Sequence, residues 1–153
     1  VKARILHIED RRENRLLVRK LLEARGFEVT DAVDGLMGLE MARQIRPDLV
    51  LLDIMMPRLS GYEVCQQLKS APATSGIPIL IVTALNEMGD IERAVEAGCD
   101  DFLTKPVNRL ELTTRVRSLL RVRRLTDERD RLLAYLADVD GFDIDAFLPP
   151  ESA

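Results

Sequence analysis

The stretch Leu49-Val50-Leu51-Leu52-Asp53 decides the fold. Four apolar residues in a row, ended by a single acid, are typical of a short strand buried on both faces of a sheet. Four other short runs have the same apolar character: Ile5 to Ile8, Phe27 to Thr30, Ile77 to Thr83 and Phe102 to Thr104. Longer amphipathic stretches separate the five runs. Strands that alternate with helices must be parallel and joined by right-handed crossovers, so the sequence predicts an α/β fold with a doubly wound five-stranded parallel sheet.

The last helix is predicted to be unusually long. Earlier helices carry stop signals such as Arg25-Gly26 and Ala97-Gly98. After Asn108, apolar residues keep helical spacing, and neither Gly nor Pro occurs before about residue 137. A weaker apolar stripe runs through the second half of this helix: Leu125, Leu132, Leu133 and Leu136. It is either the packed edge of a solvated helix or a seam for a partner helix. From Gly141 onward, the chain is either a short docked segment or a frayed end.

Composition limits the class of protein. The 153 residues are 46% hydrophobic and 31% charged, which is typical of one globular domain. The longest apolar runs fall far short of the roughly 18 residues that indicate a membrane span. Two acids, Glu9 and Asp10, occur too early in the chain for the apolar region of a signal peptide. We therefore expect a cytoplasmic protein. Cys65 and Cys99 have no metal-ligand neighbours and are expected to be core residues.

Charge and pattern divide the chain in two. Residues 121–153 hold 5 basic and 8 acidic side chains and account for most of the net charge of −4. An acidic segment of this kind argues against nucleic-acid binding. We therefore expect one domain over residues 1–122, followed by a helical extension and acidic tail over 123–153 that serve as a linker or as a dimerisation or partner segment.

Polar residues gather at the carboxyl ends of the predicted strands. Glu9 and Asp10 follow the first strand, and Asp53 ends the third. Thr83 ends the fourth strand, and Lys105 follows the fifth. In an open parallel sheet these ends share one edge, where such folds bind ligands. Three carboxylates, a hydroxyl and an ammonium are thus predicted to meet.

This combination favours phosphoryl chemistry on a carboxylate. Three clustered carboxylates repel one another and call for a hard cation such as Mg²⁺. Asp53, at the end of the most apolar strand, is the best acceptor for a phosphoryl group. Lys105 and the Thr83 hydroxyl would then bind phosphoryl oxygens. His7, inside a central strand, is interpreted as a buried imidazole with satisfied hydrogen bonds.

Four motifs together name a family. They are Ile8-Glu9-Asp10, Leu51 to Pro57 with Gly61, Val82-Thr83-Ala84, and Asp100 to Pro106. In their order and their gaps they resemble the CheY-like receiver domain of bacterial two-component response regulators, over about residues 2–122. The resemblance implies a phosphorylation-dependent switch with a flavodoxin-like fold. It also implies a histidine kinase or a histidine phosphotransfer protein as partner.

The resemblance assigns a role to each matching position. Asp53 is implied to be the phospho-acceptor, and Glu9, Asp10, Asp53 and the backbone carbonyl of Met55 are implied to hold Mg²⁺. Lys105 is implied to contact the phosphoryl group. The peptide bond between Lys105 and Pro106 is implied to be cis. Thr83 and Phe102 match the switch pair of the family. One departure is Glu9, where many members have Asp.

Further expectations concern turnover and assembly. Met55 and Leu85 flank the route of the water that would attack the acyl phosphate, and two apolar residues there predict slow self-dephosphorylation. Asp100, Asp101 and Arg115 resemble the charged surface through which many receivers dimerise, so we expect a phosphorylation-favoured homodimer.

The output of the switch stays open. The chain is either a receiver that acts by binding partners or a fragment of a larger regulator with a cyclase or phosphodiesterase effector. We do not expect an enzyme beyond its own phosphorylation and dephosphorylation. An aspartyl-nucleophile phosphatase needs a second Asp where Met55 stands, and a flavin carrier needs a phosphate loop where Asp10 to Glu13 stand.

Overall fold

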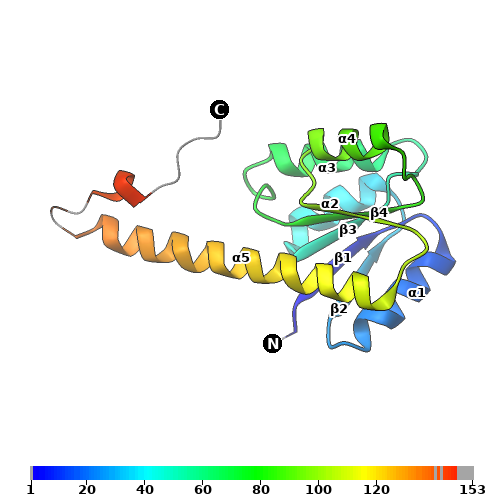
Figure 1. The fold of residues 1–153 in the computed structure, drawn as a ribbon, viewed down its shortest axis with the longest axis horizontal. Coiled ribbons are helices and arrows are strands. Elements are labelled where there is room, and N and C mark those ends of the chain that lie inside the picture. The colour runs from blue at the N-terminus through cyan, green and yellow to red at the C-terminus, as the bar shows by residue number, and fades with distance from the viewer. Residues whose placement is uncertain (1, 140, 142, 148–153) are drawn as a thin grey trace.

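The computed structural model describes residues 2–139, 141 and 143–147 (Figure 1). Strands and helices alternate along the chain. In order, they are β1 (Arg4–Ile8), α1 (Arg12–Glu23), β2 (Glu28–Ala32), α2 (Gly35–Ile45), β3 (Leu49–Leu52), α3 (Gly61–Ser70), β4 (Ile79–Thr83), α4 (Met88–Glu96), β5 (Asp101–Thr104), α5 (Arg109–Ala137) and the 3₁₀ helix η1 (Ile144–Phe147).

The sheet is parallel throughout, with the strand order β2-β1-β3-β4-β5. The order reverses between β1 and β3, so the chain winds first toward one edge of the sheet and then toward the other. All four residues of β3 are buried, as expected for the central strand of a sheet covered on both faces. The predicted doubly wound α/β fold is therefore confirmed.

Two apolar cores lie on opposite faces of the sheet. On one face α1 and α5 cover Leu49 and Leu51, and on the other α2, α3 and α4 cover Val50 and Leu52. Successive side chains of a strand point to opposite faces, which explains this alternation along β3. Cys65 is buried in the second core and Cys99 packs against it, so both occupy the apolar surroundings expected for them. Burial raises the pKa of Cys65 to about 12.

Four of the five strands differ from the prediction by one or two residues, and β1 begins one residue early, at Arg4. The strand β2 runs on through Asp31, because the Asp31 carboxylate is bonded by Arg19 of α1 at 2.8 Å from Nη2. The strand β4 begins at Ile79 rather than Ile77, because the intervening Pro78 has no N–H to donate. The strand β5 begins one residue early, at Asp101.

The helix α5 has two halves with different surroundings. Its buried residues, Leu112, Thr113 and Val116, all lie near its start. Leu119 and Leu120 still pack against the core, and after Arg123 the helix leaves the body and projects to Ala137 (Figure 1). The predicted length is confirmed. After it, η1 lies against the end of α5, and the remainder of the predicted tail falls largely outside the described residues. Within the described part of the chain, no helix has the length and apolarity needed to cross a membrane.

Candidate functional site

Three strands bring Glu9, Asp53 and Lys105 together at the carboxyl edge of the sheet. Glu9 and Asp53 directly follow the neighbouring strands β1 and β3, and the Asp53 N–H donates to the Ile8 carbonyl at 3.1 Å. Lys105 arrives from β5, anchored by its N–H on the Thr83 carbonyl at 2.8 Å. The Lys105 ammonium lies 3.1 Å from Glu9 Oε2 and 3.5 Å from Asp53 Oδ2. The predicted convergence of these three residues is therefore present.

The chain after Asp53 turns tightly around the carboxylate. Asp53 is only 5% exposed, and its Oδ1 accepts from the Met55 N–H at 3.4 Å. Gly61, at the start of α3, closes this turn by donating to the Ile54 carbonyl. A Cβ at Gly61 would overlap the Asp53 carbonyl oxygen, so only glycine permits this approach. Ser60 and Glu63 cap the helix reciprocally, which fixes where α3 begins.

Glu9 is the most enclosed acid of the site. Its Oε1 accepts from Asn14 Nδ2 at 3.0 Å and from the Arg11 N–H at 3.3 Å, while Oε2 faces Lys105. Burial raises the pKa of Glu9, but the Asn14 hydrogen bond and the Lys105 charge outweigh it and hold this pKa below its usual value. Sequence reasoning missed Asn14. Its position in the first turn of α1, which follows the Glu9-Asp10 pair, was the available signal.

Asp53 has the opposite shift. Burial raises the pKa of Asp53, the negative charge of Glu9 raises it further, and the Lys105 ammonium offsets these effects only in part. Two buried carboxylates that share one ammonium cannot both be fully compensated. The site thus has a deficit of positive charge beside Asp53.

Asp10 supplies an independent indication of a cation. Its Oδ1 is buried and, in the described part of the chain, has no hydrogen-bond partner. Glu9, Asp10 and Asp53 each offer an oxygen, and these oxygens lie within 4.8 Å of one another. An unpartnered buried carboxylate oxygen is costly in the absence of a cation or water. The donor set therefore fits a hard divalent ion.

The predicted switch residues occupy neighbouring strands next to this edge. Thr83, at the end of β4, is fully buried, and its Oγ1 accepts from the Leu85 N–H at 3.4 Å. Phe102 pairs with Ile81 across β4 and β5 and is partly buried against the core under α4. The Lys105–Pro106 peptide bond is cis. Thr83 and Phe102 thus lie on the neighbouring strands β4 and β5, and Thr83 directly precedes the loop that leads to α4.

The acids of the predicted dimer surface, Asp100 and Asp101, have different partners. Arg115 donates from Nη1 to both oxygens of Asp101, at 3.1 and 3.0 Å, which joins α5 to β5. Asp100 is engaged elsewhere, since its Oδ2 lies 2.7 Å from Lys69 Nζ and accepts from the Ile79 N–H at 2.7 Å. These contacts tie down the start of β4. The carboxylate of Asp100 is therefore held by Lys69, and of the two acids only Asp101 pairs with Arg115.

Three other residues of the sequence analysis are Leu85, Met55 and His7, and His7 differs from the expectation. Leu85 packs partly buried against the α2–α4 core, while the Met55 side chain is mostly exposed. His7 is buried as predicted, but its Nδ1 lies 3.7 Å from Asp31 Oδ1, too far for a hydrogen bond, and has no partner among the described residues.

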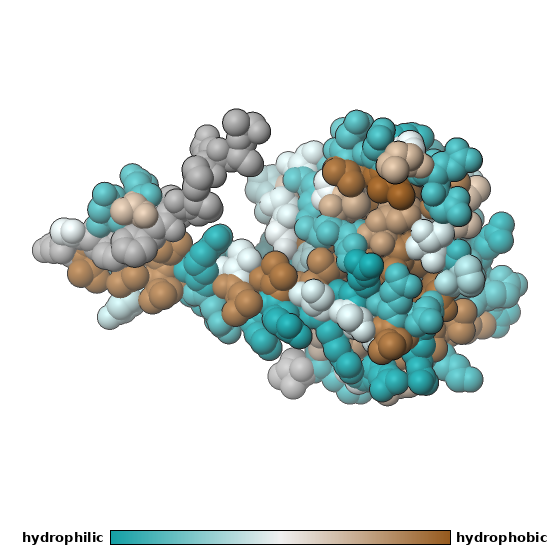
Figure 2. Space-filling view, viewed as in Figure 1, coloured by the Kyte–Doolittle hydropathy of each residue, from teal (hydrophilic) through white to brown (hydrophobic). Residues whose placement is uncertain are grey.

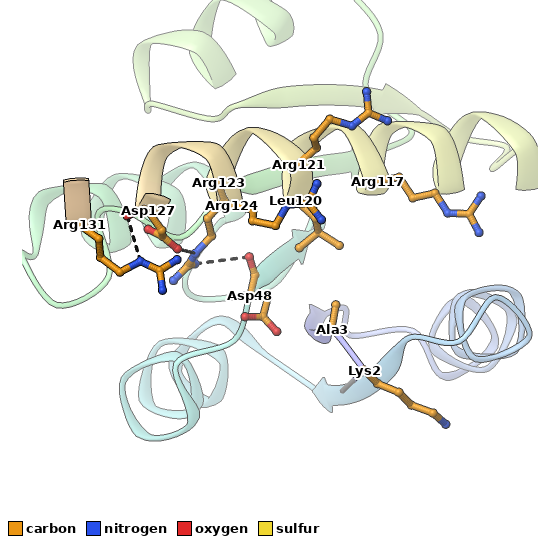
Figure 3. Close-up of a pocket in the computed structure, with 10 residues that line it drawn as sticks. All are labelled: Lys2, Ala3, Asp48, Arg117, Leu120, Arg121, Arg123, Arg124, Asp127 and Arg131. Atoms are coloured by element: carbon orange, nitrogen blue, oxygen red, sulfur yellow. Dashed lines mark hydrogen bonds and ion pairs between the residues drawn. The ribbon is translucent and has the colours of Figure 1, made fainter. Parts of the chain in front are cut away.

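A basic hollow of about 640 Å³ lies at the amino ends of the strands, opposite the acidic cluster (Figure 3). Ala3 and Asp48, which precede β1 and β3, form one side of it, and α5 forms the other. Arg123 bridges the two sides by donating to the carbonyls of Pro47 and Asp48 at 3.4 Å. This hollow is separate from the acidic cluster, and it joins the body to α5 just before the helix projects.

Comparisons with known proteins agree with this geometry. The family model described as response regulator receiver domain matches residues 5–117. The response regulator PleD of Caulobacter vibrioides is 44% identical over 126 residues, which cover 82% of this chain and 28% of PleD. The DNA-binding regulator RpaA of Synechocystis is 44% identical over 118 residues, which cover 77% of this chain and 49% of RpaA. The chain thus spans between about a quarter and a half of these two relatives.

Solved structures with the same fold include proteins from two bacteria. The receiver domain of the sensor histidine kinase PA1611 from Pseudomonas aeruginosa, described with a magnesium ion in its active-site cleft, has a TM-score of 0.74 at 30% identity, covering 78% of this chain and 98% of that one. The chemotaxis protein CheY4 of Vibrio cholerae has a TM-score of 0.74 at 26% identity, covering 78% of this chain and 99% of that one. By its sequence, its fold and its acidic edge, the chain belongs to the response regulator receiver domain family.

Proposed function

We propose that Asp53 is the residue that accepts the phosphoryl group in this two-component receiver, with Lys105 and Thr83 binding the phosphoryl oxygens. The observation that carries this proposal is the buried Asp53 carboxylate, held 3.5 Å from the Lys105 ammonium beside two further carboxylates. Receivers of this family serve phosphorylation-dependent signalling, so an acceptor residue must exist. Among the described acids, Asp53 combines burial, rigid support and a raised pKa.

The transfer needs little movement of the chain. An Asp53 oxygen attacks the phosphorus, its O–P bond forms as the donor's P–N bond breaks, and the donor histidine leaves with its electron pair. Lys105 shifts from Glu9 toward a phosphoryl oxygen, and the Met55 N–H beside Asp53 is placed to donate to the same group. A histidine kinase or a histidine phosphotransfer protein is the proposed donor, and a small phosphorylated molecule replaces it in vitro.

Magnesium is the proposed cation of the site. Glu9, Asp10 and Asp53 would hold it together with the backbone carbonyl of Met55, which leaves positions open for phosphoryl oxygens. When bound, it supplies the positive charge that Lys105 alone does not provide beside Asp53. The unpartnered oxygen of Asp10 supports this assignment.

The proposed output passes through Thr83 and Phe102 to the surface formed by α4, β5 and α5. After phosphorylation, the Thr83 hydroxyl would leave the Leu85 N–H and bind a phosphoryl oxygen, and the Phe102 ring would fill the space behind it. The Asp101–Arg115 pair lies on this surface, where it would take part in a phosphorylation-favoured homodimer. An effector domain of the cyclase or phosphodiesterase type is the proposed alternative recipient.

The test is intact mass after incubation with acetyl phosphate or phosphoramidate and Mg²⁺. We expect wild type and the control Asp130→Asn, on the exposed part of α5, to gain the mass of one phosphoryl group, and Asp53→Asn to gain none. Gain of this mass by Asp53→Asn would refute the assignment of the acceptor. Sedimentation of the same samples over a range of protein concentrations tests the surface, since phosphorylation is expected to strengthen the dimer of wild type, and Arg115→Glu is expected to lose this strengthening without changing the phosphoryl mass.

We further propose that the acyl phosphate is long-lived, because the side chains of Met55 and Leu85 carry no group that orients an attacking water. The measurement is the rate of phosphate release in Mg²⁺ buffer. A half-life of only seconds contradicts the proposal, and Met55→Asn is expected to shorten the half-life.

A further inference from the structure

The projecting half of α5 carries an exposed apolar strip. Val122, Leu125 and Leu132 are 59%, 54% and 57% exposed, and Leu136 is partly exposed. They stay exposed although η1 lies against the end of the helix. Figure 2 shows apolar surface along this part of the molecule, outside the body. Large apolar side chains clustered in this way indicate a surface that another chain covers.

The spacing of the strip is that of a coiled coil. Val122, Leu125, Arg129, Leu132 and Leu136 are separated by three, four, three and four residues, which corresponds to the alternating a and d positions of two heptads. A β-branched residue at a with Leu at d favours two strands. Val122 at a with Leu125 at d provides this combination, and Leu132 is at the next d position.

The projecting helix needs such a partner for its own stability. Residues 122–137 contribute no buried side chain, and an isolated helix of about this length is marginal in water. Its ion pairs, Arg123–Asp127 at 3.8 Å and Arg129–Asp130 at 3.1 Å, each include a solvent-exposed acid and add little. Tertiary packing of the strip would supply the missing stabilisation.

The opposite side of α5 is unsuited to a second copy of itself. Arg117, Arg124 and Arg131 are spaced by seven residues and border the basic hollow together with Lys2 (Figure 3). Two copies facing each other there would bring like charges together. The apolar strip lies on a different side of the helix, where Arg129 is the one cation among its five positions.

We infer that residues 122–136 form a parallel two-stranded coiled coil with a second copy of this chain. In a parallel pair, like positions face each other. The side chain of each Arg129 then extends out of the apolar interface toward Glu128, at position g, of the second copy. In an antiparallel pair, Arg129 would face the apolar Leu132 instead. A single charged residue at an a position costs stability but specifies the register.

The upstream part of α5 supports the parallel orientation. The same spacing continues from Val122 back to Ser118, Arg115 and Glu111, which are exposed on the body. A parallel pair joins the projecting helices and this face of the body in one continuous contact of nearly four heptads, whereas an antiparallel pair separates the two bodies. The inference goes beyond the proposed function and does not depend on phosphorylation, since no step of it uses Asp53.

The first test is sedimentation of the full chain at one protein concentration. We expect wild type to be dimeric and both Leu125→Glu and Leu132→Glu to be monomeric. The matched control is Ala134→Glu, which adds the same charge on an exposed side of the same helix away from the strip and is expected to stay dimeric. Asp53→Asn is expected to dimerise like wild type, so failure of the phosphorylation proposal leaves this result unchanged. A monomeric wild type, or dimeric Leu125→Glu and Leu132→Glu variants, would overturn the inference.

The second test fixes the orientation by disulfide cross-linking. In a parallel pair the two thiols of Leu132→Cys face each other, and a copper–phenanthroline oxidant takes two electrons as the S–S bond forms and two protons leave. We expect a covalent dimer for Leu132→Cys and none for Ala134→Cys or for wild type, whose native Cys65 is buried and whose Cys99 is only partly exposed and packs against the core. Cross-linking only between Leu125→Cys and Leu136→Cys in a mixture would show an antiparallel pair and refute the parallel one.

Discussion

The carboxyl edge of the sheet and the projecting half of α5 are stabilised in opposite ways. At the edge, the side chains that meet come from distant parts of the chain, as in the Lys105–Glu9 pair, whose members are 96 residues apart. On the projecting helix, charged side chains pair within one turn, as Arg129 and Asp130 do. The body therefore determines the geometry of the site, whereas the projecting helix depends on what binds to it.

The largest expected difference between the two regions comes from truncating one leucine in each half of α5. Leu112 is fully buried between α5 and the sheet, so Leu112→Ala is expected to lower the free energy of unfolding by about 2–5 kcal/mol. Leu125→Ala, in the exposed strip, is expected to change the unfolding of the body by less than about 0.5 kcal/mol at a protein concentration too low for dimerisation. Urea denaturation of both variants measures the contrast. Equal losses would mean that the two halves of α5 do not differ as described.

A second comparison uses two glycines. At Gly61 a methyl group would meet the Asp53 backbone, so Gly61→Ala is expected to cost about 1–3 kcal/mol and to slow phosphorylation of Asp53. At Gly89, in α4, an added methyl group would meet no atom within 4 Å, and Gly89→Ala is expected to stabilise the helix by up to about 1 kcal/mol. Thermal unfolding and phosphoryl incorporation are the measurements. Normal phosphorylation of Gly61→Ala would show that the turn around Asp53 tolerates displacement.

The smallest expected effect concerns ion pairs. Burial raises the pKa of Asp31, but the hydrogen bond and the positive charge of the Arg19 guanidinium counter burial, and this pKa lies below its usual value of 3.8. Asp31→Asn is therefore expected to cost about 1 kcal/mol at neutral pH, whereas Asp130→Asn, in the exposed pair, is expected to cost almost nothing.

The pH dependence of this difference has a definite sign. A carboxylate whose pKa is lower in the folded state stabilises fully above its unfolded pKa, and this contribution is lost as the pH falls through the lower folded pKa. Wild type and Asp31→Asn should therefore differ in stability at pH 7 and converge below about pH 4. Denaturation curves at several pH values test this, and a difference that grows on acidification would contradict it.

The fold could be predicted from the sequence because the strands are apolar and because glycines mark the ends of the helices clearly. The runs at Leu49 to Leu52 and at Ile5 to Ile8 have no competing interpretation, and the long final helix follows from its uninterrupted spacing. The end of β2 was not predictable, since an acid inside a strand is acceptable only with a partner, and Arg19 supplies it from another element.

The candidate site was predictable as a set of residues but not as a set of contacts. Strand ends place Glu9, Asp53 and Lys105 at one edge regardless of side-chain detail. The Asn14 bond to Glu9 and the engagement of Asp100 by Lys69 depend on rotamers and on the packing of α1 and α3. Such contacts between elements leave no periodic trace in the sequence.

The separation of Lys105 from Glu9 has a consequence for synthesis on the ribosome. The acids at the ends of β1 and β3 emerge long before the lysine that compensates them, and β5 is the last strand to be synthesised. Contacts that span most of a domain slow folding, because the loop they close must be ordered first. A nascent chain that has not yet released Lys105 therefore holds clustered acids without their cation, so the domain becomes competent to receive a signal only after nearly all of it has been made.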